Sequence, residues 1–184
     1  MTFHVGGQRF GTPIEQVRET IEMRPITPVF RMPAMVAGLT NLRGESLAVL
    51  DMAIPLGFGP CRRDPTARIV VVDIPLDDAP DEGRRERGGR SAGLLVDGLG
   101  PIRSIHPGDI GPVPATLPAA EAAFLRGVVS LADHPLPILD LSKVLGAPAL
   151  RAYVSDPTQS EGTAPSRTRR SLDGPSREGP PESR

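Results

Sequence analysis

The chain has 184 residues, a length typical of a single domain. Its net charge of -1 and its 3% aromatic content provide neither a strong positive field nor rings for base stacking, so we expect no nucleic-acid partner. No apolar stretch approaches the ~20 residues that span a bilayer, so direct membrane insertion is not expected either. The single cysteine, Cys61, cannot form an internal disulfide, which suits the reducing cytoplasm.

The first third of the chain predicts a hairpin, a strand and a proline-rich connection. Gly6 and Gly7 separate two short apolar runs, a hairpin pattern. The spacing of Ile14, Val17 and Ile21 could mark a helical face, but the segment is short, and we expect a brief turn or helix that leads into a strand near residues 17–23. Three prolines, Pro25, Pro28 and Pro33, then exclude regular structure until about residue 35.

A second hairpin is predicted over residues 36–50, with its turn at Arg43-Gly44-Glu45-Ser46. Gly44 can adopt a positive φ without steric cost. Arg43 would then lie at the tip of a rigid hairpin, from which a guanidinium could contact another protein. From composition alone, Arg43 could equally be a solvated surface side chain.

The central part of the chain predicts a buried strand pair. Residues 68–74 form a continuous β-branched run, which indicates burial on both faces, and residues 93–97 are its expected partner. Between them, residues 77–91 are charged and glycine-rich and are expected to form a loop. Residues 102–105 are expected to form a further short strand.

The last part of the domain predicts short helices and one hairpin. Residues 119–125 are rich in helix formers, and residues 128–131 and 136–139 predict two paired strands. Asp140 is a candidate N-cap for a short helix that stops at Gly146. We assign residues 1–150 to one domain. Residues 151–184 are rich in Pro, Ser, Gly and Arg and should be disordered, because they cannot offset an ordering cost of ~1–2 kcal/mol per residue.

The sequence contains no pattern typical of an enzyme or of a cofactor or metal site. No phosphate-binding glycine loop and no Gly-x-Ser-x-Gly elbow is present, and the three histidines lack the spacing of metal ligands. Four aspartates that follow apolar runs could form a carboxylate cluster, but we expect each of them to meet backbone donors or solvent at a strand end: Asp51, Asp73, Asp97 and Asp140. We therefore expect a binding protein, without catalytic, cofactor or metal site.

The segment Asn41-Leu42-Arg43-Gly44 resembles the Asn-Leu-Arg-Gly signature of the CheW-like family, the adaptor domains that couple chemoreceptors to the histidine kinase CheA. The resemblance extends over about residues 3–146 as a series of linked segments. These segments are residues 3–11, 14–19, 26–29, 32–38, 47–51, 56–57, 92–99, 110–114, 125–129 and 136–145.

The resemblance implies a mainly all-β fold, built as two small five-stranded barrels of SH3-like topology with one or two short helices. It also implies a function in chemotaxis and two-component signal transduction. One surface would bind the regulatory domain of a CheA-like histidine kinase. A groove between the two barrels would bind the cytoplasmic hairpin tip of a chemoreceptor, that is, of a methyl-accepting chemotaxis protein.

The same resemblance assigns the candidate partner-binding residues. The signature residues tied to coupling are Asn41, Arg43 and Gly44. Val17 and Glu19 fall on the segment near the receptor groove. Gly93 and Val96 fall on a downstream strand that borders partner sites, although core packing would equally explain an apolar residue and a glycine there.

Two alternatives remain open from the sequence. The chain could be a CheW-like scaffold in a chemosensory pathway whose output is not motility. It could also be a generic small β-barrel module that binds a peptide or a nucleic acid, but that function favours a basic or aromatic surface, which this composition lacks.

Overall fold

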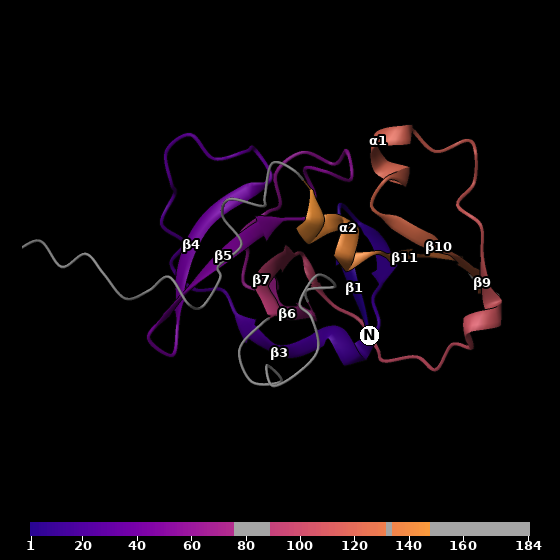
Figure 1. Cartoon of the computed structure of the whole chain (residues 1–184), viewed down its shortest axis with the longest axis horizontal. Helices are drawn as coiled ribbons and strands as arrows, with labels where there is room; N and C mark the ends of the chain where they lie inside the picture. Colours follow the sequence, from indigo (N-terminus) through magenta and orange to yellow (C-terminus); the bar gives the residue numbers. More distant parts are fainter. Residues whose placement is uncertain (76–88, 132–133, 148–184) are drawn as a thin grey trace, which may run out of the picture.

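Eleven β-strands form two sheets in the residues that this computed structural model describes, which are 1–75, 89–131 and 134–147 (Figure 1). The mainly all-β fold class predicted from the sequence is confirmed. The expected tail, 151–184, and most of the expected loop over 77–91 lie outside the described residues. The loop prediction is wrong for residues 89–91, because they belong to a strand that starts at Gly89.

One sheet has five strands in the order β3-β6-β7-β5-β4. These strands are β3 (Val17–Glu22), β4 (Val36–Leu42), β5 (Glu45–Asp51), β6 (Arg68–Pro75) and β7 (Gly89–Val96). The predicted central pair is confirmed, with β6 antiparallel to β7 and Ile69 opposite Leu95. β5 adds to β7 in parallel, and β4 follows through the hairpin that carries the signature.

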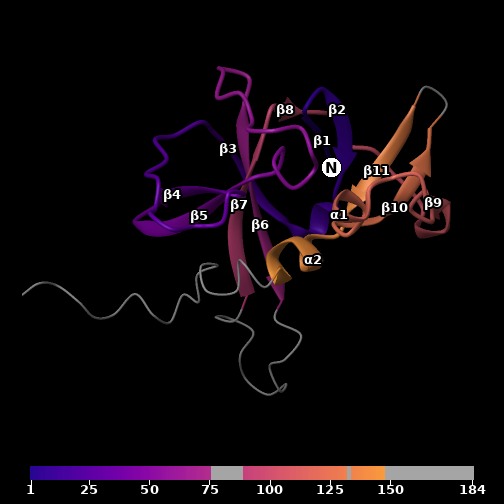
Figure 2. The same ribbon diagram turned by 90° about the horizontal axis from the view of Figure 1, so that it is seen from above.

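The other sheet has six strands in the order β8-β1-β2-β11-β10-β9. They are β1 (Thr2–Val5), β2 (Gln8–Gly11), β8 (Gly98–Leu99), β9 (Ile110–Gly111), β10 (Leu125–Ser130) and β11 (Pro135–Leu139). Five strands were expected here, and the two-residue strands β8 and β9 form the edges of the observed six. Figure 2 shows β4 and β5 at one end of the molecule and β9, β10 and β11 at the other.

The strand predicted over residues 102–105 does not form. The preceding strand, β8, pairs with β1. The last backbone hydrogen bond of this pairing runs from Gly100 N to Thr2 O, at 2.8 Å. β1 begins at Thr2, so it has no residues left to pair with the segment beyond Gly100. Residues 101–106 are therefore an irregular connection, despite their strand-like sequence.

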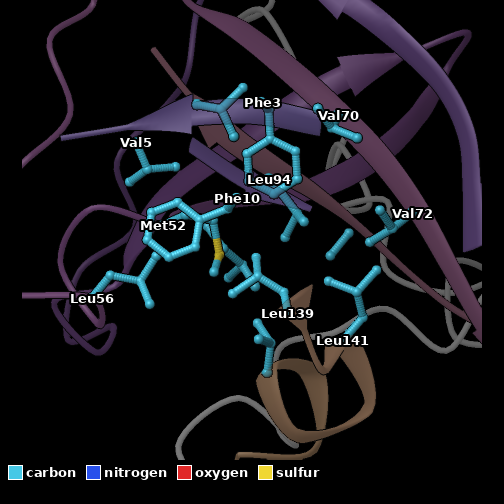
Figure 3. Close-up of a cluster of buried hydrophobic side chains, with 14 of the residues drawn as sticks. Phe3, Val5, Phe10, Met52, Leu56, Val70, Val72, Leu94, Leu139 and Leu141 are labelled. Atoms are coloured by element: carbon cyan, nitrogen blue, oxygen red, sulfur yellow. The ribbon is translucent and has the colours of Figure 1, made fainter. Parts of the chain in front are cut away.

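β6 is buried on both faces, as its β-branched run predicted. Val70 and Val72 contribute to a core between the two sheets, together with Phe3 and Phe10 (Figure 3). Ile69 and Val71 belong to a second cluster inside the five-stranded sheet. Because alternate side chains of a strand point to opposite faces, β6 links the two cores.

Four short helical elements complete the described fold. They are η1 (Ile14–Gln16), η2 (Pro107–Asp109), α1 (Ala119–Ala122) and α2 (Leu141–Gly146). The predicted cap of α2 is confirmed, since Asp140 accepts a hydrogen bond from the Lys143 N–H at 3.1 Å. α1 is shorter than the predicted span of residues 119–125, because β10 already begins at Leu125.

Candidate partner-binding surfaces

The signature residues build the tip of the β4–β5 hairpin. Arg43 and Gly44 both have positive φ, 56° and 94°, which is the backbone of a tight two-residue hairpin turn. The Asn41 side chain accepts a hydrogen bond from Gly44 N at 3.0 Å, and Leu42 is buried in the core of the five-stranded sheet. Asn41 and Gly44 thus fix the turn, and Arg43 is the residue that the turn presents.

Arg43 is held by a residue 24 positions earlier in the chain. Its Nη2 lies 3.0 Å from Oε2 of Glu19 on β3, the opposite edge strand of the same sheet. The Arg43 side chain is still 72% exposed, while that of Glu19 is 22% exposed. Arg43 is therefore paired with a carboxylate and mostly open to solvent at the same time. The guanidinium is oriented by a carboxylate and remains open to another protein.

The two edges of the five-stranded sheet meet because the segment after β3 pairs with β4. Thr27 and Leu39 exchange backbone hydrogen bonds of 2.8 and 2.9 Å, and Thr40 Oγ1 donates to Pro25 O at 3.0 Å. This contact brings β3 beside the hairpin. It explains how Glu19, which no local pattern links to the signature, reaches Arg43.

The structure separates the other three candidate residues from the hairpin tip. Val17 is half-buried and packs against the core between the sheets. Val96 is fully buried in that core. A Cβ on Gly93 would lie 2.6 Å from Cγ2 of Ile69, so Gly93 is a packing position in the centre of the sheet. Neither Gly93 nor Val96 can contact a partner directly in this conformation.

A groove that the sequence did not identify lies beside η1. Its volume is about 470 Å³, and its apolar wall consists of Ile14, Ile102, Ile105, Ile110 and Ile138. Ile102 is 69% exposed and Ile14 is 44% exposed. Two cations, Arg103 and Arg126, and the carboxylate of Glu15 also line it. Residues 102–105 carry two of these isoleucines, and the sequence predicted a short strand there instead of a groove wall.

The floor of this groove contains a polar atom without a partner. Thr12 is 4% exposed, and its Oγ1 makes no hydrogen bond in the described part of the chain. A buried hydroxyl without a partner is costly to the folded state. An exposed apolar wall with polar groups at its base suits an amphipathic peptide or helix.

Three of the four strand-end aspartates, Asp51, Asp97 and Asp140, meet backbone donors as predicted, whereas Asp73 accepts from the Ser91 hydroxyl. Asp51 accepts bonds from Ala53 N and Cys61 N, at 3.0 and 2.9 Å, and Asp97 accepts one from Gly6 N at 2.6 Å. Among the described residues, no group of three or more His, Cys, Asp or Glu side chains is placed to hold a metal ion. In the same residues, no helix has the length and apolar character needed to cross a membrane.

The fold and these surfaces define a two-sheet β module with an exposed charged hairpin tip and an open apolar groove, an arrangement suited to binding other proteins. Comparison with known proteins identifies the family. The CheW-like domain matches residues 1–149. The chain is 32% identical to the chemotaxis protein CheW of Rhizobium meliloti over 144 residues, covering 78% of this chain and 84% of that protein.

Two further relatives agree. The chain is 34% identical to protein FrzA of Myxococcus xanthus, covering 82% and 86% of the two chains. Its structure is similar to the crystal structure of the scaffolding protein TtCheW from Thermoanaerobacter tengcongensis, with a TM-score of 0.63, 26% identity and coverage of 76% and 82%. The chain therefore belongs to the CheW-like family. The resemblance carried by the linked sequence segments, and the chemosensory adaptor function that it implies, are confirmed.

Proposed function

We propose that this chain is a non-catalytic adaptor that binds two partners at once: the regulatory domain of a CheA-like histidine kinase and the cytoplasmic hairpin tip of a chemoreceptor. Holding both partners in one complex lets receptor conformation bias kinase activity, because each partner then affects the equilibrium of the other. The chain would act in the cytoplasm and reach the membrane through the receptor.

The exposed Arg43 at the hairpin tip is the observation that carries the kinase part of the proposal. A guanidinium offers a planar set of donors, and Glu19 already restricts its orientation. Binding therefore requires little additional ordering of the side chain. Asn41 and Gly44 act as positioning residues, because they set the turn on which Arg43 stands.

The groove beside η1 is the proposed receptor surface. Its exposed Ile14 and Ile102 supply apolar contact, and Arg103 and Arg126 at its border would favour a segment that carries carboxylates. η1 leads directly into β3, the strand of Val17 and Glu19. The receptor surface and the hairpin tip therefore lie on connected elements.

The first experiment is calorimetric titration of the full chain into the purified regulatory domain of its cognate kinase. Arg43→Ala should weaken binding by about 2 kcal/mol, roughly thirtyfold in Kd, as expected for an interface hot spot. Arg63→Ala, which removes an exposed arginine outside the hairpin, is the control and should bind like the wild type. Unchanged binding of the Arg43 variant would move the kinase surface elsewhere.

The receptor part is tested separately with a soluble receptor cytoplasmic fragment. Ile102→Glu should abolish binding of the fragment while leaving kinase binding intact, because it places a charge on the exposed apolar wall of the groove. Loss of both interactions would indicate misfolding, which circular dichroism would reveal. Absence of any wild-type binding to kinase and receptor would contradict the adaptor function.

A further inference from the structure

Phe30 is the most exposed of the five phenylalanines in the chain. It is 89% exposed, whereas Phe3 and Phe10 are buried and Phe58 packs edge-on against Phe10. Phe30 lies on the connection between β3 and β4, next to Val29, which is 37% exposed. Figures 1 and 2 both show this connection running outside β4, at the periphery of the molecule. The folded chain thus presents an aromatic ring to solvent.

The base of this connection is firmly attached. Besides the two Thr27–Leu39 backbone bonds, Val36 N donates to Pro33 O and Asp51 N donates to Met35 O, at 2.8 and 2.7 Å. The contact with β4 is so close that a Cβ on Gly38 would overlap the carbonyl oxygen of Thr27. The position from which Phe30 projects is therefore fixed by the sheet.

The tip itself is also restricted. Pro28 and Pro33 fix φ on either side of Phe30. Arg31 has a positive φ of 64°, and its guanidinium carbon lies 5.7 Å from the centroid of the Phe30 ring. A stacked cation of this kind limits the freedom of the ring. An exposed aromatic side chain whose freedom is reduced in this way loses less entropy when a partner buries it.

The charges around Phe30 define the chemistry of the partner. Residues 24–35 contain two cations, Arg24 and Arg31, and no acidic residue. A complementary surface has an apolar pocket for the ring and carboxylates at its border. The groove beside η1 is a poor match on a second copy of this chain, because its two arginines, Arg103 and Arg126, outnumber its one carboxylate, Glu15.

The Phe30 connection is continuous with the hairpin tip. Arg24 Nη1 donates to Asn41 O at 3.4 Å, and a shallow depression of about 610 Å³ runs from Arg24 past Leu39 to Ser46. A domain seated on the hairpin tip would therefore extend over the base of the connection. We propose that Phe30 is an aromatic anchor that inserts into an acidic-bordered apolar pocket of the kinase regulatory domain. This inference rests on the proposed function.

The experiment titrates the full-length chain and its variants into the purified kinase regulatory domain and, separately, into the receptor fragment. Phe30→Ala should weaken kinase binding at least tenfold, and Phe30→Leu should recover most of the loss. Arg31→Asn should weaken it about threefold and reduce its salt dependence, because asparagine accepts the positive φ but carries no charge. The control Arg63→Asn should change neither the affinity for the kinase domain nor its salt dependence. All variants should unfold at the wild-type temperature, since these side chains are exposed.

The outcomes separate the two proposals. If the wild type binds the kinase domain, Arg43→Ala weakens this binding and Phe30→Ala leaves it unchanged, the proposal that Phe30 is an anchor is overturned. The proposed adaptor function is then retained. A Phe30→Ala effect confined to the receptor fragment, or to self-association measured by sedimentation, would also overturn it. No wild-type binding to the kinase domain would overturn both proposals.

Discussion

The ring of Phe58 occupies the space that a Cβ atom on Gly6 would need, since that atom would overlap Cγ of Phe58. Gly6 forms the turn between β1 and β2, and Phe58 lies in the segment that follows β5. The contact therefore joins the six-stranded sheet to the chain that leaves the five-stranded sheet. Because Gly6 also has a φ of 58°, it is restricted by both packing and backbone conformation.

We predict that Gly6→Ala destabilises the protein by about 2–4 kcal/mol, the sum of overpacking and left-handed backbone strain. Gly7→Ala is the matched control. Gly7 has a φ of 79°, but no atom lies within 4 Å of the position that its Cβ would take, so only strain of about 1–2 kcal/mol applies. Urea unfolding measures both. Equal losses for the two variants would contradict the importance of the Phe58 contact.

The Arg43–Glu19 pair should contribute little to stability. Its arginine is mostly exposed, and exposed ion pairs are typically worth about 0–1 kcal/mol. A double-mutant cycle with Arg43→Ala and Glu19→Ala, followed by thermal unfolding, should give a coupling energy in that range. A coupling above about 2 kcal/mol would assign the signature arginine to stability instead of partner contact.

Gly93→Ala should impair function through folding and not through a lost contact. The added methyl would meet Ile69 Cγ2 at 2.6 Å inside the sheet, an overpacking that costs about 1–3 kcal/mol. Gly98→Ala is the control, since the nearest atom there, Thr66 O, lies 3.7 Å away. Binding per folded molecule, measured below the unfolding temperature, should be unchanged for Gly93→Ala. A binding loss at full stability would place Gly93 at a partner surface.

The thiol of Cys61 should be unreactive in the folded protein. Burial raises its pKa, and the hydrogen bond of Sγ to Asp97 Oδ1 at 3.0 Å and the nearby carboxylates raise it further. At pH 8, a disulfide reagent should label the native thiol at least about a hundredfold more slowly than the unfolded one. Asp97→Asn should restore part of the reactivity, but not all, because burial is the larger cause.

The same pKa shift predicts a dependence of stability on pH. The folded-state pKa lies above the unfolded value of about 8.5, so the folded state retains its proton where the unfolded state loses it. The contribution of the protonated Cys61 thiol to the free energy of unfolding is fully present below about pH 8.5 and is lost as the pH rises above that value. Cys61→Ser should remove this part of the slope in urea unfolding between about pH 8 and 10. An unchanged slope would contradict the assigned cause.

Local patterns in the sequence determined most of the strands. The run at residues 68–74 specified a strand with two buried faces, the glycines specified the hairpin turns, and Asp140 specified the start of α2. Each of these features depends on neighbouring residues, through side-chain alternation, positive φ or a side-chain bond to a nearby N–H. The linked segments that resemble the CheW-like family also predicted the fold class and the adaptor function.

Long-range contacts decided the geometry of the binding surfaces. Glu19 meets Arg43 because the Thr27–Leu39 contact brings the two edges of one sheet together, and residues 102–105 line a groove because β1 has ended before them. Gly93 and Val96 proved to be core positions because β7 lies between β6 and β5. Such contacts join residues many positions apart, so no local periodicity encodes them, and only the folded chain shows which side chains remain exposed.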